Sequence, residues 1–205
     1  MKKLLVATKN QGKLKEISYF LSDLPVKILS LSDIGIDYEF EEKGKTYKEN
    51  SQSKAIFYAK KSGIAAIADD GGIEITALRG APGIKSRRWV GEDSTDEKIL
   101  DHMRKIAVKL PVNKRKAFFR TVISFALPTG KAWSSLGEVE GIIARKPHYK
   151  LLKGYPYRSF FYLPKIKKYY HESDLTEGEQ KLYNHRYKAI QKLIPIIKRE
   201  MKIEN

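Results

Sequence analysis

Two adjacent carboxylates, Asp69 and Asp70, are the residues of this sequence whose types point most directly to chemistry. An apolar run over residues 64–68 precedes them, and a pair of glycines separates them from an alternating run over residues 73–78. This pattern predicts a buried strand, a turn at the glycines and a second strand. Because neighbouring strand residues point to opposite faces, we expect one carboxylate to act and the other to support it. The alternative is a polar turn that only caps a strand.

A second candidate site is an anion-binding loop near residue 10. Thr8, Asn10 and Lys13 lie between an apolar run at residues 4–7 and a helical pattern that begins near residue 14. The free backbone N–H groups and the positive dipole end of a helix at such a junction bind anions. Ordinary helix capping by Asn10 explains the same spacing, and the sequence does not choose between the two.

A third candidate is the acidic segment that precedes a predicted helix over residues 46–62. Its carboxylates, Glu39, Glu41 and Glu42, stand beside a turn in an otherwise basic chain. Such oxygen ligands suit a hard cation such as magnesium, although acidic residues also favour the start of a helix. Residues 44–46, Gly-Lys-Thr, resemble the end of a P-loop. We reject that assignment because Glu39 occupies the position of the required glycine.

The composition narrows the class of protein. The 205 residues include 40 Lys and Arg against 24 Asp and Glu, which gives a net charge of +16 and predicts attraction to nucleic acid or to a phosphate-bearing substrate. The hydrophobic content of 41% and the charged content of 31% are typical of a soluble globular protein. No window has the roughly 18 apolar residues of a membrane span, and the lack of cysteine excludes disulfides and thiolate catalysis. We therefore expect a cytoplasmic protein.

The last third of the chain alternates lysines with tyrosines, a pattern used by proteins that bind single-stranded nucleic acid. A solvated basic face explains the lysines without any partner, and we favour that interpretation while keeping nucleic-acid binding as the alternative. The tyrosines concerned are Tyr149, Tyr155, Tyr157, Tyr169 and Tyr170.

Periodicity and turn signals place the remaining elements. A short strand is expected over residues 26–31, and long strands over residues 117–127 and 131–143 join at a hairpin over residues 128–130.

Capping boxes mark two further helices. Ser94 with Glu97 and Thr176 with Glu179 have the spacing of an N-cap residue and its partner. Pro195 lies within the apolar pattern of a last helix and is expected to kink it.

Several short motifs follow one another in an order shared with a known family. They are Thr8-x-Asn10-x-x-Lys13, Glu42-x-Gly44-x-Thr46-Tyr47-x-Glu49-Asn50 with Lys54, Ala68-Asp69-Asp70-x-Gly72-Ile73-Glu74, Gly80-x-Pro82-Gly83-Ile84-x-Ser86-x-Arg88, Gly137-x-Val139-x-Gly141-x-Ile143, an aromatic loop after Gly154 and His185-Arg186. On these residues the chain resembles the inosine triphosphate pyrophosphatase family over nearly its whole length. The first four blocks together are highly specific.

The resemblance implies a fold, an activity and partners. It implies an α/β fold with a long central mixed sheet, flanking helices and two lobes with a cleft between them, so that residues 1–205 form one two-lobed domain. It also implies hydrolysis of nucleoside triphosphates between the α and β phosphorus atoms, with magnesium as cofactor. The products would be a monophosphate and pyrophosphate, the role would be cleansing of the nucleotide pool, and the assembly would be a homodimer.

The resemblance also implies roles for individual residues. Asp70 would activate or position the attacking water, and Glu42 and Asp70 would hold the magnesium ion, while Asp69 and Arg88 would support the site. The implied phosphate-binding set is Thr8, Lys9, Asn10, Lys13, Lys54 and Gly71. The implied base-binding set is Tyr155, Pro156, Tyr157, Arg158, Gln180, His185 and Arg186.

The departures from the family pattern gather in the base-binding set. Arg158 replaces an aspartate that reads the base, Pro156 replaces a glycine, and Gln180 and Asn184 replace a lysine and a serine, whereas Gly71 replaces a serine near the phosphates. An arginine donates hydrogen bonds where an aspartate accepts them. We therefore predict pyrophosphatase chemistry with altered base specificity.

Three alternatives stay open. A shift in register of Arg158 and Lys181 would rebuild a conventional base pocket. A degenerate family member would bind nucleotides or single-stranded nucleic acid without catalysis. A nucleotide sensor would result if Gly71 and Gln180 had disabled the chemistry.

Overall fold

Helices and strands alternate over the first half of the chain in the computed structural model, which describes residues 1–92 and 94–203. Short 3-10 helices lie at Ser32–Ile34, Thr76–Leu78, Gly83–Arg88, Val112–Lys114 and Pro156–Phe160. The main elements are β1 (Lys2–Val6), α1 (Gln11–Phe20), β2 (Val26–Ser30), α2 (Tyr47–Ser62), β3 (Ala65–Ile75), α3 (Asp96–Lys109), β4 (Lys116–Ala126), β5 (Ala132–Ile143), β6 (Phe161–Leu163), β7 (Lys168–Tyr169), α4 (Glu177–Tyr183) and α5 (His185–Glu200).

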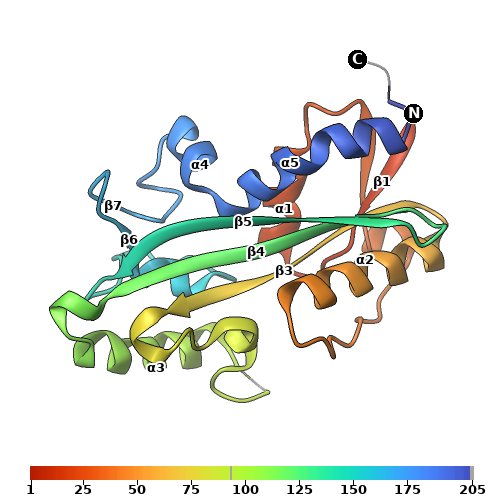
Figure 1. The fold of residues 1–205 in the computed structure, drawn as a ribbon. Helices are drawn as coiled ribbons and strands as arrows, with labels where there is room; N and C mark the ends of the chain where they lie inside the picture. Colours follow the sequence, from red (N-terminus) through yellow and green to blue (C-terminus); the bar gives the residue numbers. More distant parts are fainter. Residues whose placement is uncertain (93, 204–205) are drawn as a thin grey trace. The chain divides into compact units, whose positions relative to one another are not determined.

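The strands form a mixed sheet with helices beside it (Figure 1). Their order is β2-β1-β3-β4-β5-β6-β7. β1 pairs in parallel with both β2 and β3, whereas β5, β6 and β7 pair antiparallel. The predicted α/β fold class is therefore confirmed. No helix of the part described here is long and apolar enough to cross a bilayer.

The chain divides into two compact units, each assembled from separated segments. Unit 1 contains residues 1–70, 121–137 and 186–205, and unit 2 contains residues 71–120 and 138–185. The assignment of residues 1–205 to one two-lobed domain stays a prediction.

Unit 1 buries both faces of its strands. In β1, Leu4 and Val6 pack with α1 and α5, whereas Leu5 packs with α2 on the other face. The same alternation continues in β3, where Ile67 belongs to the first cluster and Ala68 to the second. Alternate strand residues point to opposite faces, so this pattern also fixes the two faces to which Asp69 and Asp70 belong.

The turn predicted at the two glycines after Asp70 is wrong, because β3 continues through them to Ile75. β4 is the neighbour of β3 on one side, whereas β1 pairs with the other side only at Ala65–Ile67, before the glycines. Gly71 and Gly72 need no positive φ there. The carboxylates therefore lie inside a strand and not at its end.

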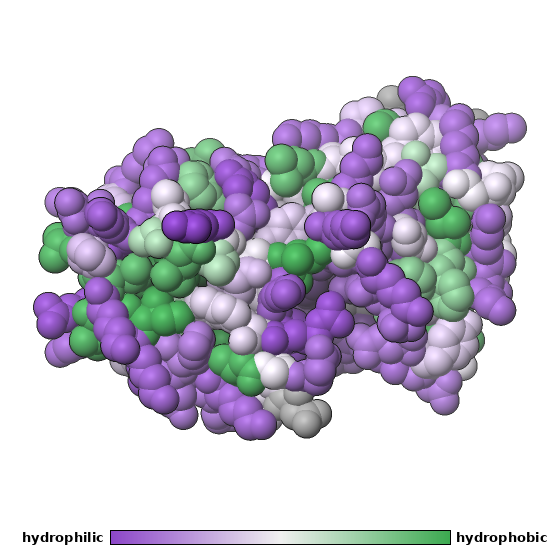
Figure 2. Space-filling view, turned by 60° about the horizontal axis from the view of Figure 1, so that its bottom comes forward, coloured by the Kyte–Doolittle hydropathy of each residue, from purple (hydrophilic) through white to green (hydrophobic). Residues whose placement is uncertain are grey.

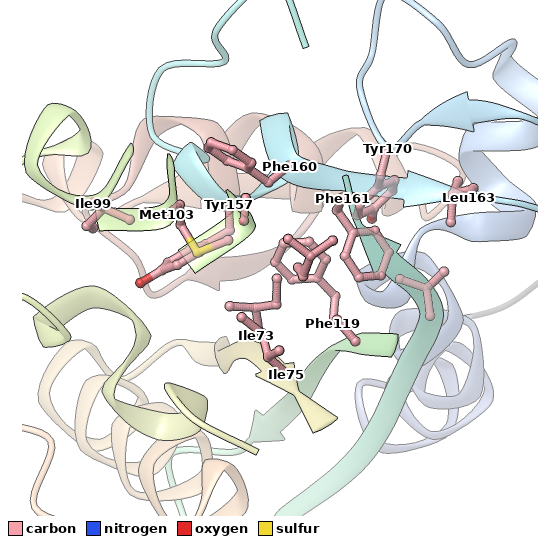
Figure 3. Close-up of a cluster of buried hydrophobic side chains, with 14 of the residues drawn as sticks. Ile73, Ile75, Ile99, Met103, Phe119, Tyr157, Phe160, Phe161, Leu163 and Tyr170 are labelled. Atoms are coloured by element: carbon pink, nitrogen blue, oxygen red, sulfur yellow. The ribbon is translucent and has the colours of Figure 1, made fainter. Parts of the chain in front are cut away.

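Unit 2 has a separate aromatic and aliphatic core (Figure 3). Ile73 and Ile75 of β3 and Phe119 of β4 contribute to it, together with Met103 of α3 and Phe161 of β6. Every one of these side chains is less than 10% exposed.

The predicted caps and hairpin have different outcomes. α3 begins one residue later than expected, because Thr95 Oγ1 and not Ser94 accepts a hydrogen bond, from Lys98 N at 3.3 Å. Ser94 Oγ instead donates to Gly91 O at 2.5 Å. The capping box of Thr176 before α4 is confirmed, as is the hairpin between β4 and β5.

Candidate functional site

Asp69 lies at the centre of a buried ion network in unit 1. Its side chain is 0% exposed, Lys13 Nζ lies 3.2 Å from Oδ1, and Arg186 Nε donates to Oδ2 at 3.0 Å. Arg186 Nη1 also donates to Glu16 Oε2 at 3.0 Å. Burial favours the neutral acid, but Lys13, Arg186 and Lys54 outweigh it and hold the pKa of Asp69 below its usual value. Asp69 therefore remains a carboxylate.

The start of α1 positions Lys13 for this contact. Asn10 is the N-cap residue, and its Oδ1 accepts a hydrogen bond from Lys13 N at 3.0 Å. Thr8 Oγ1 in turn accepts from Asn10 N at 3.2 Å. The capping role considered for Asn10 is thus confirmed, and the cap orders the turn that carries Lys13.

Asp70 belongs to the opposite face of β3. Asn50 Nδ2 donates to Asp70 Oδ2 at 3.0 Å, and Asn50 Oδ1 accepts from Gly44 N at 2.7 Å. A Cβ at residue 44 would lie 2.5 Å from Asn50 Oδ1, so glycine permits this approach. Burial and the nearby charge of Glu42 raise the pKa of Asp70 to about 6. The two neighbouring aspartates therefore have opposite pKa shifts.

Lys54 of α2 forms an ion pair with Glu42, and 13% of its side chain is exposed. Burial alone would lower the pKa of Lys54, but Glu42, Asp69 and Asp70 together raise it. The Lys54 ammonium group thus compensates the charges of carboxylates on both faces of β3, Asp69 on one face and Asp70 on the other. The helix that carries it starts at Thr46, which caps Glu49 N, so the Gly-Lys-Thr tripeptide is a helix start.

We call the group of charged side chains around Asp69 and Asp70 the carboxylate cluster. The cluster has one more carboxylate than it has cations, so its net charge is negative. A bound divalent cation would make the net charge positive, and the cluster would then attract a triphosphate. A hollow of about 400 Å³ lies beside Asn50, and its other lining residues include Glu41, Gly44 and Ser53. The members of the carboxylate cluster are Glu16, Glu42, Asp69, Asp70, Lys13, Lys54 and Arg186.

Unit 2 contains a second group, which we call the aromatic cluster: Phe119, Tyr155, Arg158, Tyr170 and His185. The Arg158 guanidinium lies 4.1 Å from the ring centre of Tyr155 and 4.6 Å from that of Tyr170. Tyr170 Oη and His185 Nδ1 are 2.9 Å apart, and His185 stacks on Phe119. The cluster combines flat rings with hydrogen-bonding groups, which suits a purine base.

The predicted base-binding residues are distributed between the two units. Tyr155, Arg158 and His185 meet around Tyr170 in unit 2, whereas Arg186 belongs to the carboxylate cluster of unit 1. Tyr157 lies in the unit 2 core (Figure 3), where its Oη donates to Ser86 O at 2.6 Å and burial raises its pKa.

The remaining predicted residues have simpler surroundings. Gln180 Nε2 donates to Leu175 O at 3.4 Å, and Pro156 is buried at the start of a 3-10 helix. Lys9 is exposed and donates to Asp37 O, Arg88 is exposed, and Gly71 lies within β3.

Two members of the clusters, Glu16 and Phe119, and the neighbouring Asn50 had no role in the sequence interpretation. Glu16 lies three positions after Lys13, so the two residues lie on one face of the helix. This spacing of opposite charges indicates an ionic group. Asn50 lies in a matched motif but its contact with Asp70 crosses 20 positions. Phe119 lies in an apolar strand and gives no such signal.

The lysine and tyrosine alternation does not form a stacking platform in unit 2. Tyr157 and Tyr170 are 7% and 2% exposed, and only Tyr149 of the five tyrosines is largely exposed, at 80%. Hydrophilic residues cover most of the face shown in Figure 2, with smaller hydrophobic patches. A solvated basic surface accounts for the lysines.

The chain matches known proteins along nearly its full length. A profile of the Ham1 family matches residues 4–196. The chain belongs to the Ham1 family. A dITP/XTP pyrophosphatase of Desulforamulus reducens is 35% identical over 197 residues, covering 96% of each chain. Another from Shigella flexneri is 36% identical, covering 97% of this chain and 99% of the relative.

Solved Ham1 structures have the same fold. A HAM1 protein from Coxiella burnetii has a TM-score of 0.81 at 31% identity, over 97% of this chain and 100% of that one. The Ham1 protein of Staphylococcus aureus has a TM-score of 0.79 at 31% identity over the same shares. The family expected from the sequence motifs is thereby confirmed.

Proposed function

We propose that this Ham1-family chain is a nucleoside triphosphate pyrophosphatase of the dITP/XTP type in which the order of preference among bases has changed. It would release a monophosphate and pyrophosphate and so remove unusual bases from the nucleotide pool. The observation that carries the proposal is the carboxylate cluster, in which a carboxyl group of raised pKa lies beside buried cations. The names of the relatives support the substrate class.

Glu42 and Asp70 would hold a magnesium ion. Each oxygen ligand suits a hard cation, and the effect of Glu42 on the pKa of Asp70 reflects two negative charges that a cation between them would relieve. Magnesium, when bound, would neutralise the charge that develops on the phosphate oxygens.

The protein side chains would position the water and the phosphates. Asp70 would accept a proton from water or orient it, since a carboxylate with a pKa near 6 is ionised at neutral pH yet remains a usable base. Lys13 and Lys54 would bind phosphate oxygens. Asp69 is fully buried, so it would act by holding Lys13 and Arg186 in place.

The aromatic cluster would bind the base. The ring of Tyr155, which is half-buried while those of Phe119, Tyr170 and His185 are buried, would stack on a purine. Arg158 would donate hydrogen bonds where the family aspartate accepts them. We therefore propose a base preference that differs from the usual preference for inosine and xanthosine.

The test is pyrophosphate release from a panel of inosine, xanthosine, guanosine, adenosine and pyrimidine triphosphates. Asp70→Asn should lower kcat by about 10²- to 10⁴-fold, because a positioned base contributes roughly that factor. Asp101→Asn, an exposed aspartate on α3, is the matched control and should keep full activity. Chelation of the divalent ion should abolish release. Undiminished turnover by Asp70→Asn, or no turnover of any triphosphate, would contradict the proposal.

The homodimer and the cytoplasmic location implied by the resemblance stay predictions. Light scattering on the purified chain measures the first, and microscopy of the tagged protein in its host measures the second.

A further inference from the structure

Two of the four histidines of the chain meet in unit 2, where His171 directly follows Tyr170 of the aromatic cluster. His148 and His171 are 4% and 3% exposed, and their rings stack with centres 4.2 Å apart. His148 Nε2 lies 3.0 Å from Asp174 Oδ1, and 24% of the Asp174 side chain is exposed. We call these three residues the histidine cluster.

Each imidazole has its Nδ1 atom held by the local chain. His148 Nδ1 lies 3.1 Å from Lys150 N and 3.0 Å from Lys150 O, so a partner exists whether or not this nitrogen carries the proton. His171 Nδ1 likewise lies 3.1 Å from Ser173 N and 2.9 Å from Ser173 Oγ. Contacts of this kind at the second ring nitrogen orient histidines that bind metals through Nε2.

The other ring nitrogen of His171 points to a missing ligand. His171 Nε2 is buried and has no hydrogen-bond partner among the described residues. A buried polar group without a partner is costly, and such groups in folded proteins call for an explanation. An ion bound at Nε2 would remove that cost.

We propose that His148, His171 and Asp174 form a second cation site, for a zinc-type ion. One ligand atom from each residue lies within 4.8 Å of the others. Two imidazoles and one carboxylate are the donors of zinc and of related transition ions, whereas magnesium requires oxygen ligands. The partial exposure of Asp174 allows water to complete a four-coordinate shell.

Closure of the site would need only a small movement. Ligand atoms around a tetrahedral zinc ion with bonds of about 2.0–2.2 Å lie about 3.4 Å apart. The most separated pair of ligand atoms, within 4.8 Å, would approach by up to about 1.4 Å, whereas His148 Nε2 and Asp174 Oδ1, which are 3.0 Å apart, would separate slightly. All three residues belong to unit 2, whereas Glu42 and Asp70 belong to unit 1, so the two sites share no ligand.

The experiment measures zinc binding by calorimetry on chelator-treated full-length protein, with cobalt absorption as a report of tetrahedral geometry. We expect one zinc ion per chain from this site. His171→Asn and Asp174→Asn should each weaken zinc binding by at least about tenfold. Loss of a residue that only hydrogen-bonds to a metal ligand already lowers metal affinity by about that factor. His102→Asn, a histidine of α3 outside the cluster, is the matched control and should bind normally.

A double variant, Glu42→Gln with Asp70→Asn, separates the two sites and should keep its zinc. In the wild type, zinc should also shift the proton NMR signals of His148 and His171 but not that of His102. This measurement tests the site even if one of the variants folds poorly. The proposal is overturned if the wild type binds no zinc, if His171→Asn and Asp174→Asn bind as tightly as the wild type, or if the double variant loses the ion.

Discussion

The carboxylate cluster of unit 1 and the aromatic cluster of unit 2 hold their polar groups by different means. In the first, buried charges of both signs fix one another, as Asp69 does with Lys13 and Arg186. In the second, Arg158 packs on the rings of Tyr155 and Tyr170. Charged groups constrain partners strongly because an unpaired buried charge is very costly, whereas ring contacts tolerate many side chains.

This contrast explains where the chain departs from its family. The residues of the carboxylate cluster that the family motif covers are retained, while the base-binding loop has changed at Pro156 and Arg158. A change within the ion network would leave a charge without compensation. Under the proposed function, a change on the aromatic rings would alter which base is preferred.

Asp69→Asn tests the ion network and should have the largest effect. Removing one partner from a buried ion pair costs roughly 3–5 kcal/mol of the free energy of unfolding, because Lys13 and Arg186 keep their charge. Urea unfolding at pH 7 measures the loss, with Asp101→Asn as an exposed control. A loss no larger than that of the control would contradict the network.

The same variant has a defined pH dependence. The pKa of Asp69 is lower in the folded chain than its usual 3.8, so its stabilisation is present above pH 3.8 and disappears as the pH falls through the folded value. The difference between wild type and Asp69→Asn should therefore shrink in acid.

Glu42→Gln tests the coupling between carboxylates within the same cluster. Burial and Glu42 raise the pKa of Asp70 from 3.8 to about 6. The free energy of unfolding should therefore decrease as the pH rises from 3.8 to about 6. Removal of the Glu42 charge should shift the Asp70 titration to lower pH. Carbon-13 NMR of the metal-free protein measures it, and Glu41→Gln, an exposed neighbour, should leave it unchanged.

In the wild type with magnesium, the acid limb of kcat/KM should lie at lower pH than the Asp70 titration of the metal-free protein, because a bound cation favours the carboxylate form of its ligand. Lowering the magnesium concentration should move this limb toward higher pH. An acid limb that does not respond to magnesium would show that Asp70 is not the group that must be ionised.

Arg158→Asp tests the aromatic cluster and should change specificity with a smaller effect on stability. Replacing a donor by an acceptor should alter the ratio of kcat/KM for dITP over dATP by about tenfold or more. Lys153→Asp, an exposed cation in the same loop, should not change the ratio. Arg158→Asn serves if the buried carboxylate prevents folding. An unchanged ratio in a folded variant would remove Arg158 from base recognition.

Tyr157→Phe should have the smallest effect. It tests whether Tyr157 belongs to the unit 2 core or to the base-binding site. It removes the hydrogen bond from Tyr157 Oη to Ser86 O, which should cost about 1 kcal/mol of unfolding free energy. The base ratio should not change, since this side chain belongs to the unit 2 core. Tyr149→Phe, which is exposed, is the control for thermal denaturation. A changed base ratio would place Tyr157 at the substrate.

Local pattern was sufficient for much of the fold. The apolar run at residues 64–68 predicted a strand, and the geometry of strands correctly placed Asp69 and Asp70 on opposite faces. Turn chemistry located the hairpin between β4 and β5. The predicted turn at the glycines after Asp70 was wrong because their local preference is overridden by the extended strand β3, whose neighbour there is β4.

The sequence by itself determined the family, the α/β class and the residue types that carry the chemistry, since these depend on motifs and on short-range periodicity. Only the tertiary structure decided the contacts. Arg186 reaches Asp69 across 117 positions, and Asp70 acquires its raised pKa from burial and from Glu42. Pairings over such separations, and the burial that shifts a pKa, are set by packing of the whole unit, which no local pattern encodes.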